Sequence, residues 1–202
     1  MASSKLLKER IESIQDTMKI TNAMYMISST KLRKAKKNLE ETEPYFYTLQ
    51  TMVSRIVRHL PEIDNKYFDE RKDKPAGEKT TGLIVVTADK GLAGAYNHNV
   101  LKMAEEQMQK AGQTGSYKLF VVGELGRQYF GHRGIKVAEQ FHYTAQNPTL
   151  HRARIITETI LEQFEEEQLD VVYIIYTHVF IFFVLGCLLY TSPSPRDRQK
   201  SR

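Results

Sequence analysis

The fold is decided by residues 7–60, which read LKERIESIQDTMKITNAMYMISSTKLRKAKKNLEETEPYFYTLQTMVSRIVRHL. Alternating steps of four and three residues give a series that is almost entirely apolar. We call it the seam, and it consists of Leu7, Ile11, Ile14, Met18, Thr21, Tyr25, Ser28, Leu32, Ala35, Leu39, Thr42, Phe46, Leu49, Val53, Ile56 and Leu60. A hydrophobic repeat averaging about 3.5 residues keeps one side of a helix against a partner and is typical of a left-handed coiled coil. We therefore predict a coiled-coil helix over residues 1–60.

Two features of this helix can be judged from its length and from Pro44. At 1.5 Å per residue the helix spans about 80 Å, more than a compact domain needs. This length disfavours the alternative in which the helix packs on its own domain. Pro44 removes one backbone donor, but the phase of the seam continues beyond it, so we predict a bend near Glu43 rather than an end.

A basic cluster follows a section that is apolar around most of its circumference. The apolar section holds Met18, Ile20, Met24, Tyr25, Met26 and Ile27, and the basic cluster is Lys31, Arg33, Lys34, Lys36 and Lys37. Such a run of charge is ordinarily a solvated face. A helix that is apolar on most sides is enclosed on most sides, so the position of the cluster favours a shaft held in a collar with an acidic ring.

The second half of the chain has a different pattern. Residues 61–81 are polar, contain Pro61, Pro75 and Gly77, and are predicted to be a linker. In residues 82–178, strands alternate with helices, which predicts a Rossmann-like α/β domain with a mostly parallel sheet. The expected strands are Gly82–Thr87, Tyr117–Val122, Ile135–Val137 and Leu169–Tyr176. One expected helix runs from Asn97 or Asn99 to Lys110, a short one lies near Leu125–Gly131, and a third begins near Pro148 and reaches Gln168.

The sharpest local motif is TADKGLAGAYN at residues 87–97, which follows the first strand. A loop at this place in an α/β sheet can bind a nucleotide. Gly91 and Gly94, however, match neither the dinucleotide fingerprint nor the phosphate loop. The motif, with Lys90 in its turn, is better explained as a structural loop in which Asp89 and Asn97 accept hydrogen bonds from backbone donors.

Composition sets limits on the remaining classes. The net charge of +5 is compatible with nucleic acid, an anionic membrane or an acidic protein as partner. The single Cys187 excludes a disulfide framework and a cysteine zinc site. The six histidines form no catalytic or metal-binding pattern, and no secretory signal opens the chain. We therefore expect no catalytic site, cofactor or metal. The basic cluster leaves nucleic-acid binding as an alternative, although Glu40, Glu41 and Glu43 interrupt the basic stripe.

Three segments resemble the gamma subunit family of bacterial F-type ATP synthases, which forms the central rotor stalk. They are KITNAMYMISSTKLRKAKK at residues 19–37, VVTADKGLAGAYN at 85–97 and VVGELGRQYFGHRG at 121–134. The resemblance covers about residues 1–178. It implies a non-catalytic shaft that couples proton translocation to ATP synthesis by rotating within a hexamer of alpha and beta subunits, at the cytoplasmic face of the bacterial plasma membrane.

The resemblance also assigns roles to particular residues. It implies that the N-terminal helix pairs with a C-terminal helix. It places Met24 and the basic cluster, which comprises Lys31, Arg33, Lys34, Lys36 and Lys37, opposite acidic lever loops of the beta subunits. The α/β domain would contact the epsilon subunit and the membrane c-ring.

The resemblance stops near His178. Residues 187–197, CLLYTSPSPRD, back-translate to the codons of a common transposase-type sequencing adapter, which predicts that residues 179–202 are a non-native tail on a C-terminally truncated chain. A second interpretation starts from residues 171–190, which carry no charge and are followed by basic residues. That run is long enough for a tail anchor in a membrane.

Overall fold

The computed structural model describes residues 2–59, 69, 71–142, 145–179 and 185–191. The chain divides into two compact units, Met1–Pro61 and Glu62–Arg202. The first unit consists of helix α1, and the second is an α/β sheet unit. The predicted fold class, a long N-terminal helix with a mostly parallel α/β sheet, is confirmed.

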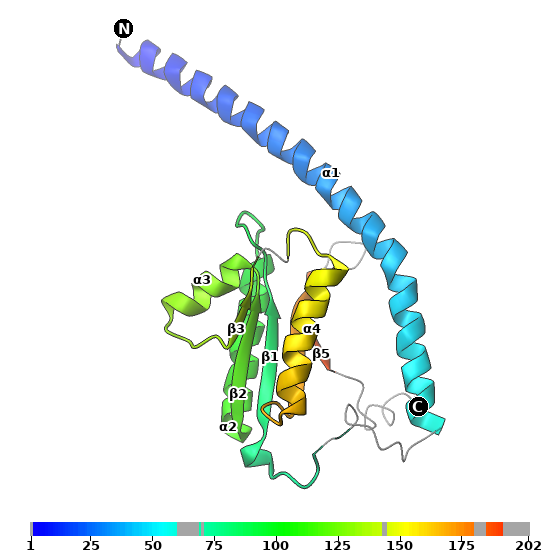
Figure 1. The fold of residues 1–202 in the computed structure, drawn as a ribbon. Coiled ribbons are helices and arrows are strands. Elements are labelled where there is room, and N and C mark those ends of the chain that lie inside the picture. Colours follow the sequence, from blue (N-terminus) through cyan, green and yellow to red (C-terminus); the bar gives the residue numbers. More distant parts are fainter. Residues whose placement is uncertain (1, 60–68, 70, 143–144, 180–184, 192–202) are drawn as a thin grey trace. The chain divides into compact units, whose positions relative to one another are not determined.

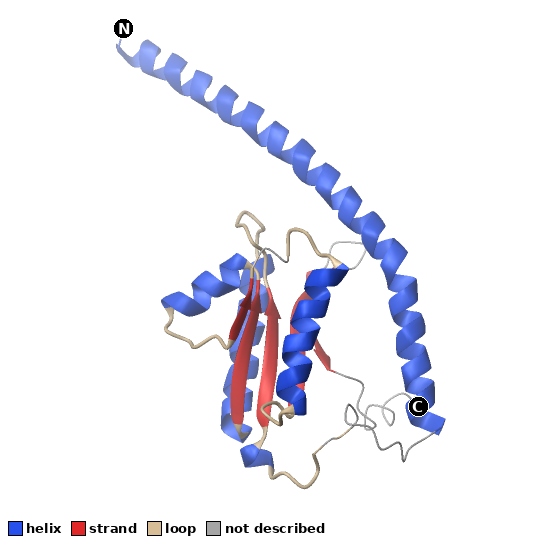
Figure 2. Ribbon diagram, viewed as in Figure 1, coloured by secondary structure: helices blue, strands red, loops and turns tan. Residues whose placement is uncertain are grey.

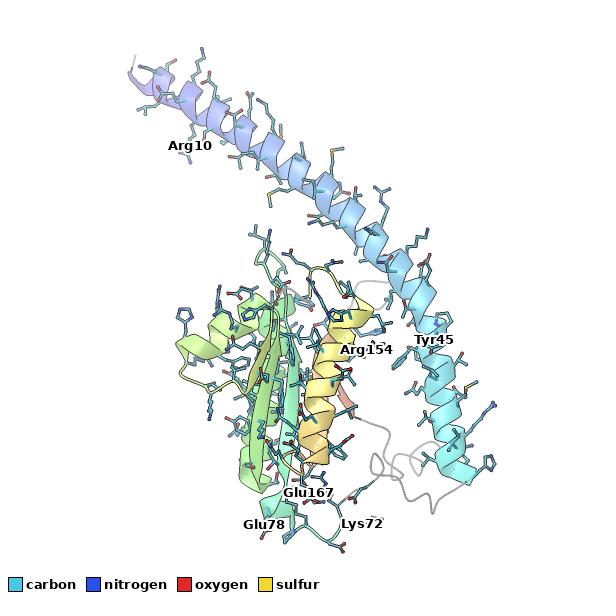
Figure 3. All side chains as sticks on the ribbon, in the orientation of Figure 1. Arg10, Tyr45, Lys72, Glu78, Arg154 and Glu167 are labelled. Atoms are coloured by element: carbon cyan, nitrogen blue, oxygen red, sulfur yellow. The ribbon has the colours of Figure 1, made fainter. Side chains whose placement is uncertain are left out.

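Helix α1 runs from Ala2 to His59 with Pro44 inside it. Figure 1 shows one continuous ribbon that curves as its colour passes from blue to cyan, and Tyr45, the residue next to Pro44, is labelled in that part in Figure 3. The polar seam residues Thr21 and Thr42 donate their hydroxyl hydrogen bonds to the carbonyls of Thr17 and Asn38, at 2.9 and 2.8 Å. These bonds satisfy the hydroxyl donors within the helix, so both residues fit an otherwise apolar seam.

The second unit is built on a sheet with strand order β3-β2-β1-β4-β5. The strands are β1 (Thr80–Val86), β2 (Ser116–Val122), β3 (Glu139–Phe141), β4 (Val171–Val179) and β5 (Leu185–Thr191). The first four pair in parallel, and β5 pairs with β4 in the antiparallel sense. The central strands β1 and β2 are buried on both faces, which explains their runs of apolar residues.

Helices cover both faces of this sheet. On one face, α2 (Tyr96–Thr114) and α3 (Glu124–His132) pack Val100, Met108 and Phe130 against Leu83 and Leu119 of the central strands. On the other face, α4 (Leu150–Glu165) contributes Ile160 to a second apolar cluster. Figure 2 shows the strands between these helices. A short 3-10 helix, η2 (Ala76–Glu78), precedes β1.

The predicted strand Ile135–Val137 is wrong, because the strand in this region is Glu139–Phe141. Gly134 has a positive φ of 68°, and the Ile135 N–H donates to the Phe130 carbonyl at 3.0 Å, which closes the end of α3. Ile135 and Val137 are apolar because they pack against the core from the connecting segment. Pairing with β2 begins only after that segment.

The region predicted to be a linker is bound to the sheet unit over its second half. Arg71 and Lys74 both contact Asp170 at the start of β4, and β1 begins at Thr80, within the predicted linker. Residues 60–68 and 70 lie outside the described part of the chain.

Strands β4 and β5 occupy most of the uncharged run at residues 171–190, where a tail anchor was the alternative. Among the helices that the structure describes, none is both long enough and apolar enough to cross a membrane. Strand β5 lies inside the expected non-native tail, 179–202. It pairs with β4 in the antiparallel sense.

Candidate interaction surfaces

The basic cluster on α1 surrounds most of the helix. With about 100° of rotation per residue, the five side chains lie at roughly 0°, 140°, 200°, 240° and 300° around the axis. The gap in this ring contains the seam positions Leu32 and Ala35, at roughly 100° and 40°. All five basic residues are exposed. They form a band of positive charge that is open only along the seam.

This band has few partners within its own helix. Lys37 lies 3.8 Å from Glu41, and both side chains are largely exposed. An exposed pair at one helical turn contributes only about 0.3–0.5 kcal/mol. The positive charge of the cluster is therefore largely available to another molecule, and at physiological ionic strength it acts over about 8 Å.

The apolar section preceding the basic cluster is also exposed. Met24 is 47% exposed, and Tyr25, Met26 and Ile27 are 72%, 69% and 58% exposed. These consecutive residues point in all directions around the helix. Large apolar groups exposed on every side mark a site of interaction with a protein or a membrane. The structure thus places Met24 about two to three and a half turns before the basic residues, on the same exposed helix.

The loop motif at the end of β1 has a structural arrangement. The Asp89 carboxylate accepts hydrogen bonds from the Glu124 N–H at 3.2 Å and from the Gln146 N–H at 2.9 Å. The Asn97 side-chain oxygen accepts from the Ala88 N–H at 2.9 Å. Asp89 thereby joins the loop to the start of α3 and to the segment before α4.

The tip of this loop differs from its base. Lys90, Gly91 and Gly94 are exposed, and Gly94 has a positive φ of 55°. Leu92 is 93% exposed and also has a positive φ, of 61°. The structure does not bring Lys90 or the two glycines into the hydrogen-bonded base that Asp89 and Asn97 form.

The base of the loop is completed by a close approach between Thr87 and α3. The buried Thr87 hydroxyl donates to the Val122 carbonyl at 3.1 Å and accepts from the Gly126 N–H at 2.9 Å. A side chain at Gly126 would begin 2.8 Å from this hydroxyl, and one at Gly123 would begin 2.2 Å from the Thr87 carbonyl. The two glycines of the GELG segment are therefore explained by packing.

These contacts bear on whether a nucleotide could bind at the carboxyl end of β1. In nucleotide-binding sheets, free backbone N–H groups at a helix N-terminus bind the phosphate. Here the Glu124 N–H at the start of α3 donates to the carboxylate of Asp89, a negatively charged group of the same chain. This arrangement favours the structural interpretation of the motif over nucleotide binding.

A buried ionic cluster around Asp170 was not found from the sequence. The Asp170 side chain is fully buried, and it accepts from Arg71 at 2.7 Å, from Lys74 at 2.8 Å and from the Thr80 N–H at 2.6 Å. Arg71 also donates to the carbonyls of Leu169 and Phe164. Burial by itself raises the pKa of Asp170, but the hydrogen bonds from Lys74, Thr80 and Arg71 outweigh it and hold the pKa below its ordinary value.

The start of α3 carries a second perturbed carboxylate. The hydrogen bond from Arg127, followed by that from Gln128, lowers the pKa of Glu124 to about 2. This residue lies in the first turn of α3, where a negative charge also suits the helix dipole. Asp89 and Glu124 together concentrate carboxylates at this helix end.

The helix and the sheet unit together indicate a class of protein. A long exposed helix with an apolar seam and a charged band is joined to an α/β unit in which Asp89 and Asn97 accept hydrogen bonds from backbone N–H groups of their own chain. This combination favours a subunit of a larger assembly. A family model described as ATP synthase matches residues 3–181. The chain belongs to the ATP synthase family.

Individual relatives agree with this assignment. The ATP synthase gamma chain of Acetivibrio thermocellus is 43% identical over 180 residues, which cover 89% of this chain and 59% of that one. The gamma chain of Ruminiclostridium cellulolyticum is 40% identical, with 86% and 58% covered. The chain thus spans less than two thirds of the length of these relatives. The fold is similar to the Tetrahymena thermophila mitochondrial ATP synthase central stalk and c-ring structure, with a TM-score of 0.59, 22% identity and coverage of 85% and 72%.

Proposed function

We propose that this chain is a central-stalk (gamma) subunit of an F-type ATP synthase, in which α1 is the rotor shaft. The observation that carries the proposal is the exposed band of positive charge on α1, which borders an exposed apolar section in a chain of this family. The chain itself would be non-catalytic. It would couple proton translocation to ATP synthesis at sites on other subunits.

The geometry of α1 suggests how such a shaft acts. The basic cluster leaves one sector of the circumference apolar, so a surrounding ring of subunits would face different surfaces as the shaft turns. A ligand shifts a two-state partner only through contacts that differ between its states. The rotating band would provide that difference to acidic loops of the beta subunits and so bias their conformations in turn.

The expected strength of the ion pairs suits a contact that changes as the shaft turns. Each exposed ion pair contributes about 0.2–1 kcal/mol, and the pairs are screened by salt. A few such pairs bias the orientation of the shaft without locking it in place. Met24 and the exposed apolar section beside it would provide steric contacts that follow the shape of the ring.

The proposal includes the remaining partners. Alpha and beta subunits would surround α1, and the α/β unit would meet the epsilon subunit and the c-ring. The complex would then lie at the cytoplasmic face of the bacterial plasma membrane. A relative from Acetobacterium woodii, which is 36% identical, is named sodium ion specific. The identity of the coupling ion is therefore a separate question from the role of α1 as the shaft.

The proposal is tested by association with alpha and beta subunits. The chain is mixed with a purified alpha–beta hexamer, and binding is followed by native mass spectrometry at increasing salt. We expect a one-to-one complex that weakens as salt rises. The triple variant Lys31→Glu, Lys34→Glu, Lys37→Glu should bind at least tenfold more weakly, because repulsion replaces the attraction of several exposed pairs.

The matched control makes the same change of charge on the sheet unit. It is the variant Lys102→Glu, Lys110→Glu, Lys136→Glu, in which all three lysines are exposed, and it should bind the hexamer like the unmodified chain. Equal weakening in both variants, or no hexamer binding at all, would refute the proposal. Binding to duplex DNA with a steep salt dependence, in the absence of hexamer binding, would favour the nucleic-acid alternative.

A further inference from the structure

The segment that precedes β1, residues 71–79, is held against the sheet unit by Arg71. The Arg71 side chain is only 11% exposed, although it lies in a polar stretch of sequence. Its guanidinium donates to the Asp170 carboxylate and to the Leu169 carbonyl, each at 2.7 Å, and also to the Phe164 carbonyl. The same group lies over the Phe164 ring, 4.6 Å from the ring centroid. One side chain thus contacts the end of α4 and the start of β4 together.

The chemistry of these contacts suits arginine. The planar guanidinium carries several donors in a fixed geometry, so it can serve three acceptors at once, which a lysine ammonium on a flexible stem does less well. A positive charge is also favourable at the C-terminal end of a helix. Helix α4 has no basic residue in its own last turn. Arg71 therefore supplies that charge from a distant part of the chain.

The backbone at Arg71 is also unusual. Its φ is 45°, in the left-handed region that residues other than glycine rarely adopt. The Arg71 N–H donates to the Asp69 carboxylate at 2.8 Å, and the Lys74 N–H donates to the Arg71 carbonyl at 3.1 Å. A strained conformation of this kind persists only where surrounding contacts hold it. The buried guanidinium provides those contacts, so the turn and the side chain depend on each other.

The other end of the same segment is also fixed to the sheet unit. A side chain at Gly115, just before β2, would begin 2.3 Å from the Lys79 carbonyl, so the two backbones approach closely. Figure 3 labels Lys72 and Glu78 of this segment at the same end of the unit as Glu167, which follows α4. The segment thus belongs to the sheet unit over its whole length.

We propose that Arg71 is an anchor that limits how far α1 and the sheet unit can move apart. Helix α1 ends at His59, and β1 begins at Thr80. From His59, a fully extended chain reaches about 40 Å to Arg71 but about 70 Å to Thr80. The anchor therefore removes nearly half of the reach that the connection would otherwise have.

The anchor has a consequence for the shaft. A shorter connection absorbs less rotation before α1 passes its turning on to the sheet unit. This consequence rests on the proposed function, whereas the anchor itself does not. The experiment below uses the chain without the hexamer, so the anchor and the proposed function can fail separately.

Pulsed EPR on the full chain measures the range of separations between the two units. Spin labels are attached to Arg55→Cys on α1 and Gln109→Cys on α2, both exposed positions, in a Cys187→Ser background. An excess of unlabelled chain restricts the measurement to labels within one molecule. Arg71→Met keeps an unbranched apolar side chain but removes the donors, so it should widen the distribution by up to about 30 Å. Asp73→Asn, exposed in the same segment, is the control and should leave the distribution unchanged.

Hydrogen exchange on the same variants separates release of the anchor from unfolding. In Arg71→Met, the amides of residues 71–79 should exchange at least about tenfold faster, while those of β2 keep their protection. Arg71→Lys retains a cation beside Asp170 and should widen the distribution less. If only Arg71→Met loses protection in β2, the result for Arg71→Lys decides.

Three outcomes would overturn the proposal. The first is an unchanged distribution of separations in a folded Arg71 variant. The second is an equal widening in Asp73→Asn, because the effect would then not come from the guanidinium. The third is loss of β2 protection in both Arg71 variants, which would show that Arg71 is required for folding of the sheet unit rather than for holding the segment.

Discussion

Asp170→Ala is expected to destabilise the α/β unit by removing the centre of its buried ionic cluster. Removing one partner of a buried pair costs about 3–5 kcal/mol, because an uncompensated charge is left behind. Here the lower end applies, since Arg71 retains the Leu169 carbonyl at 2.7 Å and the Lys74 side chain is 29% exposed. We expect a loss of about 3 kcal/mol, a large fraction of the roughly 5–15 kcal/mol that stabilises a typical domain.

Native-state hydrogen exchange on the full chain measures this loss where it occurs. About 3 kcal/mol corresponds to roughly a hundredfold faster exchange of the most protected amides in β1 and β4. Asp73→Asn is the matched control, because Asp73 is exposed in the same segment, and its effect should stay within about 0.5 kcal/mol. Equal exchange in the two variants would show that the cluster around Asp170 does not stabilise the sheet.

The same cluster predicts a pH dependence with a definite sign. The folded-state pKa of Asp170 lies below its ordinary value. A depressed pKa contributes stability that is fully present above the unfolded pKa of about 3.9 and is lost as pH falls through the folded value. The difference in protection between the unmodified chain and Asp170→Ala should therefore be constant near neutral pH and shrink below about pH 4. A difference that grows on acidification would contradict this sign.

Three further outcomes follow from the α/β unit. Gly123→Ala should lower the free energy of unfolding in urea by at least about 1–3 kcal/mol, because its new Cβ would lie 2.2 Å from the Thr87 carbonyl and its φ is 99°. Gly77→Ala is the control and should be nearly neutral, because the space around Gly77 is open. Asp89→Ala should speed amide exchange at Glu124 and Gln146 while Asp89→Asn does so less, and unchanged exchange would contradict the bridging role. An NMR titration should find a Glu124 pKa of about 2. The stability that ionised Glu124 contributes to α3 should therefore be lost only as pH falls from near the ordinary pKa of a glutamate toward 2. An ordinary pKa would refute the ion pair between Glu124 and Arg127.

Local patterns determined most of what the sequence could predict. The long helix followed from the repeat of the seam, and the central strands followed from short apolar runs that are buried on both faces. The basic cluster was also visible, because its members lie on one helix within two turns. Periodicity and charge are properties of neighbouring residues, so no tertiary contact is needed to detect them.

The failures arose where distant residues determine the structure. Asp170 lies 99 and 96 positions from Arg71 and Lys74 in the sequence, and a polar segment with prolines gave no signal that it would bind there. The strand predicted at Ile135–Val137 failed for a related reason. Its apolar residues contact the core from a connection, and alternation of residue types does not distinguish that contact from strand pairing.

The two units use their polar groups in opposite ways, and this contrast supports the proposal that the interaction surface lies on α1. In the α/β unit, Asp89, Asn97 and Thr87 bind backbone groups of their own chain, at the edge of the sheet where related topologies hold a ligand. On α1, a band of charge and the seam beside it remain exposed, although exposed apolar groups are costly unless another molecule covers them. The backbone donors that Asp89, Asn97 and Thr87 bind are satisfied within the sheet unit, whereas the exposed apolar surface of α1 favours association. The physical demand for association therefore lies on α1, and substitutions there should change assembly before they change folding.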